Sequence, residues 1–218
     1  WSEKILQGMS ECLGAYSIVA SSNDTLFAFR DPWGFRPLVL GKLNGFFVVA
    51  SETCALDTIG AVYIRDVVPG EVIAINKKGL LKLGKILQKE MKFCLFEYVY
   101  LARPDSILNN MLVHEARQRS GEMLAKEAPV DADLVVAIPD SGTSAALGYA
   151  RASGIPFGEI LIKNRYIGRT FIQPGNELRH FGAKMKFNAD KEILNGKKVV
   201  IIDDSIVRGT TLKQSILR

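Results

Sequence analysis

The stretch that most constrains the fold is a run of four apolar residues, 199–202 (VVII), followed directly by two carboxylates, Asp203 and Asp204. A short run rich in β-branched residues is typical of a strand buried on both faces of a parallel sheet. In open α/β sheets, ligands bind in the crevice beyond the carboxyl ends of the strands. The run therefore predicts an α/β fold with a binding site that contains both carboxylates.

The residues that follow the two carboxylates suit a phosphate group. They include a cation, a glycine and two hydroxyls at the predicted start of a helix, where free backbone N–H groups can bind an anion. An Asp-Asp pair alone more often caps a helix. The complete run from 203 to 211 is more specific, and it indicates a sugar phosphate site whose carboxylates bind hydroxyl groups or a hydrated cation.

A second loop of this kind follows another predicted strand, residues 133–138. Its residues Asp140, Ser141 and Gly142 precede a helix predicted over residues 144–153. Taken alone, the loop is equally well interpreted as a tight turn with a helix cap. Two such loops in one sheet are better explained together, with one loop binding the phosphate of a ligand and the other its pyrophosphate.

Positive charge is densest between Lys163 and Lys186, where six cations accompany only one acidic residue, Glu177. In residues 163–175 the cations alternate with aromatic and turn residues, which fits an exposed basic loop as well as a binding segment. The net charge of +5 is otherwise dispersed. A small acidic substrate fits the local cluster as well as a nucleic acid does, and the dispersed charge elsewhere does not argue for nucleic acid, which we do not expect as a partner.

Two kinds of pattern divide the chain near residue 90. Residues 1–90 predict a mainly antiparallel sheet with one helix over residues 51–60, capped by Ser51. Residues 91–218 alternate helix and strand, which predicts a parallel α/β sheet. A helix is predicted over residues 109–128, with an apolar stripe formed by Met111, Leu112, Ala116, Met123 and Leu124.

The cysteines and the hydropathy indicate the compartment. Cys12, Cys54 and Cys94 are few, odd in number and far apart, so they predict no disulfide framework and favour a reducing, cytoplasmic setting. No apolar run approaches the roughly 20 residues of a membrane span. The first residues lack the pattern of a secretory signal, and we expect no membrane partner.

These motifs together resemble the amidophosphoribosyltransferase family. The run 203–211 resembles the phosphoribosyl pyrophosphate signature of type I phosphoribosyltransferases, and residues 96–106 and 163–175 also resemble the family. Residues 30–38, 50–56 and 65–71 resemble the later half of a glutamine amidotransferase domain of the N-terminal-nucleophile type. The resemblance implies a partial amidotransferase sandwich over residues 1–90 and a partial phosphoribosyltransferase sheet over residues 91–218.

The resemblance also implies the chemistry. Family members transfer ammonia from glutamine to 5-phosphoribosyl 1-pyrophosphate and form 5-phosphoribosylamine, the first step of de novo purine synthesis. It implies that Mg²⁺ is bound by Ser141, Asp203 and Asp204, that residues 163–175 form a lid, and that the full-length protein is a homo-oligomer. The implied ligand-binding residues are Asp140, Ser141, Gly142, Lys163, Arg165, Tyr166, Arg169, Asp203, Asp204, Ser205, Ile206, Val207, Arg208, Gly209, Thr210 and Thr211.

Cys94 is open to two interpretations, and two other segments carry structural expectations only. Cys94 corresponds in some members to a [4Fe–4S] ligand, whereas the sequence alone favours a small buried apolar residue. Arg30 and Asp31 carry no chemistry that the sequence reveals, and they are expected to pair weakly across a surface turn. The segment Arg103-Pro104-Asp105-Ser106 is expected to form a turn with a helix cap.

The sequence departs from the family at its first residue. The glutaminase nucleophile of the family is an N-terminal cysteine, and residue 1 here is Trp, so we expect an internal fragment without a catalytic residue for glutamine hydrolysis. Two alternatives are a non-catalytic phosphoribosyl pyrophosphate sensor and a salvage phosphoribosyltransferase. The implied lid over residues 163–175 argues against the sensor, because a sensor needs no exclusion of water. The amidotransferase-like residues argue against the salvage enzyme, because it needs no source of ammonia.

Overall fold

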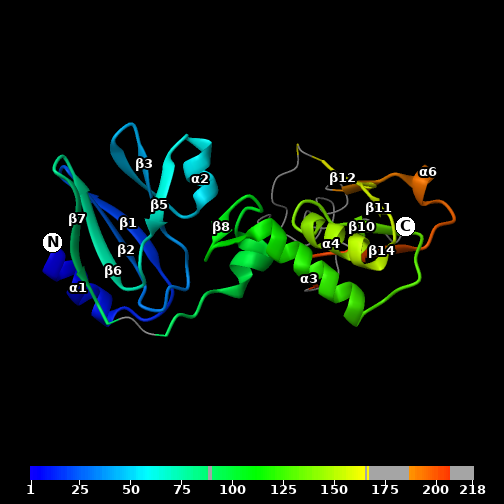
Figure 1. Cartoon of the computed structure of the whole chain (residues 1–218), viewed down its shortest axis with the longest axis horizontal. Helices are drawn as coiled ribbons and strands as arrows, with labels where there is room; N and C mark the ends of the chain where they lie inside the picture. The colour runs from blue at the N-terminus through cyan, green and yellow to red at the C-terminus, as the bar shows by residue number, and fades with distance from the viewer. Residues whose placement is uncertain (88–89, 165, 167–186, 207–218) are drawn as a thin grey trace, which may run out of the picture. The chain divides into compact units, whose positions relative to one another are not determined.

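The computed structural model describes residues 1–87, 90–164, 166 and 187–206. The chain divides into two compact units, Trp1–Val113 and His114–Arg218, each with sheets of its own (Figure 1). Residues 91–113 thus pack with the first unit. The domain boundary near residue 90 is based on the two sets of sequence motifs, and it stays a prediction.

The part of the first unit before residue 90 contains two antiparallel sheets, in agreement with the mainly antiparallel pattern predicted there. One has the order β1-β2-β6-β7 and the other the order β4-β3-β5. A shared core between the sheets includes Ala28, Leu40 and Ile73. The strands are β1 (Ser17–Ser22), β2 (Thr25–Arg30), β3 (Val39–Leu43), β4 (Phe46–Ala50), β5 (Val62–Asp66), β6 (Glu71–Asn76) and β7 (Gly79–Lys85).

Two helices accompany these sheets, although the sequence predicted one. The additional helix is α1 (Ser2–Glu11), which packs on β7 and β6. The predicted helix is α2 (Thr53–Thr58), and its N-cap is Glu52 rather than the predicted Ser51. Glu52 is held in an extended conformation because its carboxylate accepts hydrogen bonds from Arg103 N–H and the Ser106 hydroxyl.

The turn at residues 103–106 is therefore confirmed, but Ser106 does not cap a helix as expected. Its hydroxyl lies 2.7 Å from Glu52 Oε2. A π-helical turn, η1 (Glu97–Leu101), precedes this segment, and the short hairpin β8 (Ile107–Leu108) and β9 (Met111–Leu112) follows it.

This hairpin corrects the predicted start of the long helix. Asn109 and Asn110 both have positive φ, 47° and 61°, which is the backbone of a two-residue type I′ turn. The helix α3 consequently runs from Val113 to Glu127 and not from residue 109. The helical spacing of the apolar residues extended the predicted helix over Asn109 and Asn110, although asparagine tolerates the left-handed conformation of a turn.

The buried face of α3 also differs from the predicted stripe, because Met123 and Leu124 are 52% and 39% exposed. The face that α3 buries includes Gly121 and Ala125. A Cβ added at Gly121 would lie 1.8 Å from the carbonyl oxygen of Ala145, and one added at Gly148 would lie 1.9 Å from that of Gln118. The backbones of α3 and α4 (Thr143–Ser153) are therefore in direct contact.

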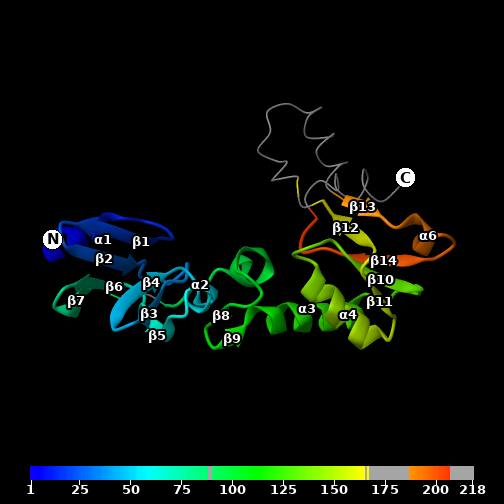
Figure 2. The same cartoon turned by 90° about the horizontal axis from the view of Figure 1, so that it is seen from above.

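The second unit contains the predicted parallel sheet. Its order is β11-β10-β14, with β10 (Leu134–Ala137) between β11 (Phe157–Gly158) and β14 (Val199–Ile202). Figure 2 shows α3 and α4 below this sheet, and the antiparallel pair β12 (Leu161–Lys163) and β13 (Phe187–Ala189) above it with α6 (Lys191–Leu194). As predicted, α4 ends at Gly154.

The strand at residues 199–202 is less buried than predicted. Only Ile202 is buried, whereas Val199, Val200 and Ile201 are half-buried. Within the described residues, β14 pairs with β10 on one side only, so the strand lies at an edge there. Among the helices of the described residues, none is long and apolar enough to cross a membrane.

Candidate functional site

The two predicted loops leave the sheet from neighbouring strands. β10 and β14 run parallel in a register that pairs Ala137 with Ile202, and Ile138 N–H donates to the Ile202 carbonyl over 2.9 Å. The carboxyl ends of both strands therefore lie side by side. This confirms the adjacency on which the predicted site depends.

Gly142 brings the two loops into contact. It is the N-cap of α4, and its N–H donates to the carbonyl of Ile138. A Cβ at this position would lie 2.6 Å from the carbonyl oxygen of Ile202 and 3.3 Å from Cα of Asp203. The first loop thus rests directly on the start of the second, and a residue with a side chain would separate them.

The second loop is held mainly by its own side chains. The N–H of Asp204 donates to Asp203 Oδ1 over 2.8 Å, and the Ser205 hydroxyl donates to Asp204 Oδ1 over 2.6 Å. Both carboxylates are half-buried, whereas Ser205 and Ile206 are exposed. The carboxylates therefore lie where a ligand at the strand ends can reach them.

A cation from another strand reaches the first loop. Lys163, the last residue of β12, forms an ion pair with Asp140, whose side chain is 78% exposed. The peptide bond between Pro139 and Asp140 is cis, and Ser141 is half-buried. Hydroxyl, carboxylate and ammonium groups thus gather at one strand end, a set that can bind an anion or a hydrated metal ion.

A half-buried polar group beside the first turn of α4 was missed by the sequence analysis. The Nδ1 atom of His114 lies 2.9 Å from the hydroxyl of Ser144, and its Nε2 lies 3.0 Å from Nε2 of Gln118. Ser144 is 4% exposed and belongs to the first turn of α4. The only signal in the sequence is a histidine one helical turn before a glutamine, which is too common a pattern to indicate a site.

Several predicted ligand-binding residues lie outside the described part of the chain: Arg165, Arg169, Val207, Arg208, Gly209, Thr210 and Thr211. Of the remaining lid residues, Tyr166 is exposed and its N–H donates to Asn164 Oδ1 over 3.0 Å. The described residues therefore contain the strand-end half of the predicted site.

The donor set fits Mg²⁺ better than a soft metal. In the described ranges, no cluster of three or more His, Cys, Asp or Glu residues could hold a metal ion. The predicted set is smaller, with two half-buried carboxylates and one hydroxyl, and Mg²⁺ typically binds one or two carboxylates while it keeps waters and substrate phosphates. Asp203, Asp204 and Ser141 are therefore compatible with this ion.

The described residues give Cys94 no cluster partners, because all three cysteines are free thiols and an iron–sulfur cluster needs four thiolates. Cys94 itself is half-buried, and its backbone is hydrogen-bonded to Phe35 and Glu97. The iron–sulfur ligand stays a prediction.

The expected surface pair of Arg30 and Asp31 is wrong, because both side chains are buried, at 2% and 0% exposure. The Arg30 guanidinium donates to three backbone carbonyls, and Asp31 accepts from three backbone N–H groups. They fix the polypeptide between β2 and β3. Residues 31–37 have the composition of a surface turn, so the burial of Arg30 and Asp31 was not predicted.

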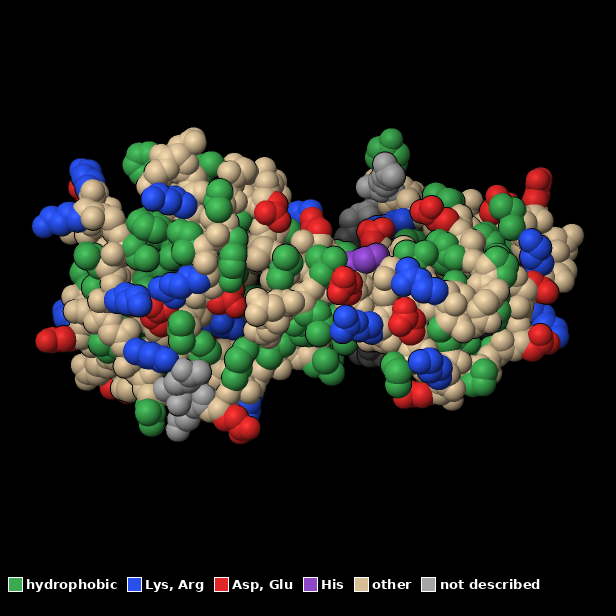
Figure 3. All heavy atoms as spheres, viewed as in Figure 1, with side chains coloured by type: hydrophobic (Ala, Val, Ile, Leu, Met, Phe, Trp, Pro, Cys, Tyr) green, Lys and Arg blue, Asp and Glu red, His purple; other side chains and the backbone are tan. Residues whose placement is uncertain are grey.

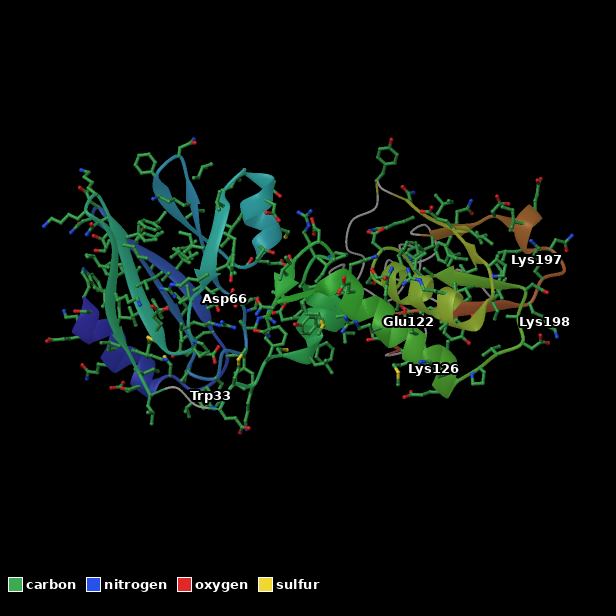
Figure 4. The ribbon with its side chains drawn as sticks, viewed as in Figure 1. Trp33, Asp66, Glu122, Lys126, Lys197 and Lys198 are labelled. Atoms are coloured by element: carbon green, nitrogen blue, oxygen red, sulfur yellow. The ribbon has the colours of Figure 1, made fainter. Side chains whose placement is uncertain are left out.

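Charge on the visible face of the second unit is mixed, with Lys and Arg side chains beside Asp and Glu (Figure 3). Lys197 and Lys198 precede β14, at the end of that strand opposite to Asp203 (Figure 4). Lys198 forms an exposed ion pair with Asp131 over 3.1 Å. Each end of the sheet thus carries a lysine–aspartate pair, and only the carboxyl end adds the two loops.

Comparison with known proteins confirms the resemblance. No protein-family model matches the chain. It is 49% identical over 219 residues to the amidophosphoribosyltransferase of Synechocystis sp., covering 99% of this chain and 44% of the relative. It is 51% identical over 198 residues to that of Mycobacterium tuberculosis, covering 91% and 37%.

Solved structures give the same result. A glutamine phosphoribosylpyrophosphate amidotransferase from B. subtilis, complexed with ADP and GMP, matches 99% of this chain and 47% of its own with 45% identity and a TM-score of 0.86. A structure described as the allosteric regulatory enzyme of purine biosynthesis matches with 46% identity and a TM-score of 0.84, covering 96% of this chain and 45% of its own. The chain thus spans less than half the length of these relatives.

Proposed function

We propose that the chain is part of an enzyme that transfers ammonia from glutamine to 5-phosphoribosyl 1-pyrophosphate and forms 5-phosphoribosylamine, the first step of de novo purine synthesis. The names of the relatives support this activity, and it is proposed for the whole protein because the chain spans under half their length. The observation that carries the proposal is the contact of the two strand-end loops at Gly142.

Within this proposal the two predicted domains have different tasks. Residues 1–90 belong to a glutamine amidotransferase domain of the N-terminal-nucleophile type, which the two antiparallel sheets support. Residues 91–218 belong to a phosphoribosyltransferase domain, which the parallel sheet supports. The cytoplasmic location and the homo-oligomer remain predictions of the sequence analysis.

The ligand spans the two loops. The loop with Asp140, Ser141 and Gly142 binds the pyrophosphate, and Lys163 exchanges its partner Asp140 for a phosphate oxygen. Asp203 and Asp204 accept hydrogen bonds from the ribose hydroxyls, and Ser205, Ile206 and residues 207–211 surround the 5-phosphate. When bound, Mg²⁺ would be held by Ser141, Asp203 and Asp204 and would neutralise charge on the pyrophosphate.

The chemistry requires little from the protein beyond binding and orientation. The bond between the anomeric carbon and the pyrophosphate breaks as ammonia attacks, through a transition state that resembles an oxocarbenium ion. Lys163 stabilises the charge that grows on the departing oxygen. Water competes at the same carbon, which gives the predicted lid over residues 163–175 its purpose.

The two alternatives lack comparable support. A salvage phosphoribosyltransferase needs no ammonia source, yet the similarity to amidophosphoribosyltransferases extends through the first unit. A sensor needs no exclusion of water, and the relatives are named as transferases.

The test is the double substitution Asp203→Asn with Asp204→Asn in the whole protein. We expect Mg²⁺-dependent affinity for phosphoribosyl pyrophosphate, measured by titration calorimetry, to fall by about tenfold or more, because charged hydrogen-bond acceptors are lost. The matched control is Asp131→Asn, an exposed carboxylate whose partner is Lys198 at the opposite end of the sheet, and it should leave the affinity unchanged. An unchanged affinity in the double variant would contradict the assigned ribose and metal roles.

A further inference from the structure

We propose that His114 is a positioning residue for the pyrophosphate loop and that it acts through Ser144. The inference rests on the proposed function of the loop at residues 140–142. His114 lies in the first turn of α3, and Ser144 lies in the first turn of α4, two residues after Gly142. The imidazole therefore connects the two helices directly behind the loop.

The hydrogen-bonding atoms determine which nitrogen carries the proton. A glutamine amide nitrogen only donates, so Gln118 Nε2, at 3.0 Å, requires His114 Nε2 to accept. The neutral imidazole then carries its proton on Nδ1, which donates to the Ser144 hydroxyl oxygen over 2.9 Å. The hydrogen bonds thus run in one direction, from Gln118 through His114 to Ser144.

This direction fixes the first turn of α4. Because Ser144 Oγ accepts from the imidazole, its own hydrogen points away from His114. Ser144 is 4% exposed, so its hydroxyl contacts other protein groups at the start of α4 and does not itself reach a ligand. Gly142 N–H is already bonded to the Ile138 carbonyl, and Thr143 N–H lies 3.4 Å from the carbonyl of Asp140. These backbone hydrogen bonds close the loop, and the loop leads directly into the helical turn that contains Ser144.

The helix pair gives this anchor a rigid base. Gly121 and Gly148 bring the backbones of α3 and α4 into contact, and the two helices lie side by side in both Figure 1 and Figure 2. Gln118 takes part in both features, because its carbonyl meets Gly148 while its side chain holds His114. The imidazole therefore links a fixed helix contact to the start of the loop.

A purely structural histidine would make a different contribution from a positioning one. Loss of a structural hydrogen bond would lower the free energy of unfolding and leave the relative affinities for different ligands unchanged. Loss of a positioning bond would weaken pyrophosphate at the first loop more than ribose 5-phosphate, whose phosphate and hydroxyls belong to the second loop. The two ligands, measured on the same protein, separate the two roles.

The experiment uses the whole protein with His114→Leu, Ser144→Ala and the double variant. We expect affinity for pyrophosphate with Mg²⁺ to fall by about three- to tenfold in each, as for the loss of one hydrogen bond, with no further loss in the double variant. Affinity for ribose 5-phosphate should change less than about twofold. His114→Asn, whose amide N–H lies near the position of Nδ1, should recover the affinity, and Glu115→Gln on the same turn, with its side chain 56% exposed, is the control.

Three outcomes would overturn the inference alone: unchanged pyrophosphate affinity, an equal loss for both ligands, or additive losses in the double variant. A proton on Nε2 of His114, detected from the imidazole ¹⁵N chemical shifts, would also overturn it. If the unsubstituted protein binds neither pyrophosphate nor ribose 5-phosphate, the proposed function fails together with the inference.

Discussion

Two sets of charged side chains, one in each unit, serve opposite purposes. In the first unit, Arg30 and Asp31 are buried and each is bonded to three backbone groups. In the second unit, Asp140 is exposed and its partner Lys163 belongs to a different strand. Burial costs a charge its hydration, so a buried charge needs partners that never leave, whereas an exposed charge can exchange its partner for a ligand.

The comparison separates charges that hold the fold from charges that bind. A charge saturated by backbone groups has no capacity left for a substrate. A charge that pairs through a single exposed contact contributes little to stability and can rearrange at low cost. Three sets of substitutions test this distinction, each through its effect on the free energy of unfolding.

The largest effect is expected for Arg30→Met. It removes the donors of three carbonyls, those of Gly34, Arg36 and Val67, which then lie buried without these partners. We expect a loss of about 3–5 kcal/mol in the free energy of unfolding of the first unit, measured by urea denaturation. Arg103→Met, at an exposed guanidinium paired with Asp105, is the control and should not shift the transition. An equal transition midpoint in both variants would break the comparison.

An intermediate effect is expected at Glu97, a buried carboxylate with poor partners. Burial raises its pKa, the charge of Arg36 offsets this in part, and Glu52 adds to the rise. The Arg36 guanidinium lies 2.9 Å from Oε1 without hydrogen-bond geometry, so that contact is charge attraction only. Glu71 is the opposite case, because hydrogen bonds from Arg65 and Val68 N–H outweigh its burial and lower its pKa.

The direction of each pKa shift determines how the stability of the first unit depends on pH. The folded state of Glu97 favours the protonated form, so its ionisation destabilises the first unit as the pH rises from the usual carboxyl range through the raised pKa. Glu97→Gln should therefore stabilise the unit at pH 7 and lose that advantage under acid. Glu71→Gln should instead destabilise at pH 7, with the effect disappearing as the pH falls through the lowered pKa. Thermal unfolding between pH 3 and pH 8 checks both, and matching profiles would contradict the assignment.

The smallest effect on stability is expected at the strand ends. Lys163→Met and Lys198→Met each remove one lysine of an exposed lysine–aspartate pair, at opposite ends of the sheet. Both should change the free energy of unfolding by less than about 0.5 kcal/mol. Only Lys163→Met should weaken pyrophosphate binding in calorimetry. Equal affinities in the two variants would remove Lys163 from the proposed site.

The sequence predicted the features that local patterns determine. Alternating strand and helix identified the parallel sheet, and the pairing of Ala137 with Ile202 follows because carboxyl ends of neighbouring parallel strands meet at one edge. The Asn44-Gly45 turn between β3 and β4 is another feature that local sequence determines, because both residues have positive φ, which Asn and Gly tolerate. The predicted adjacency of the two loops was therefore a consequence of topology and needed no side-chain detail.

The features that were missed depend on contacts between distant residues. The buried face of α3 was predicted from apolar side chains, but the helix contact is made by Gly121 and Gly148, which no hydropathy pattern detects. The role proposed for His114 depends on its hydrogen bond with Ser144, thirty positions later in the chain. Arg30 appeared as a surface charge because its partners are backbone carbonyls, which every sequence contains.

The contact between α3 and α4 also limits how this protein can change over generations. A methyl group at Gly121 or Gly148 would meet a carbonyl of the opposite helix, and main-chain atoms, unlike side chains, cannot be exchanged for smaller ones. No second substitution can therefore compensate for the first. Random mutagenesis followed by selection for growth should return both positions unaltered, although neither contributes an atom to the proposed ligand site.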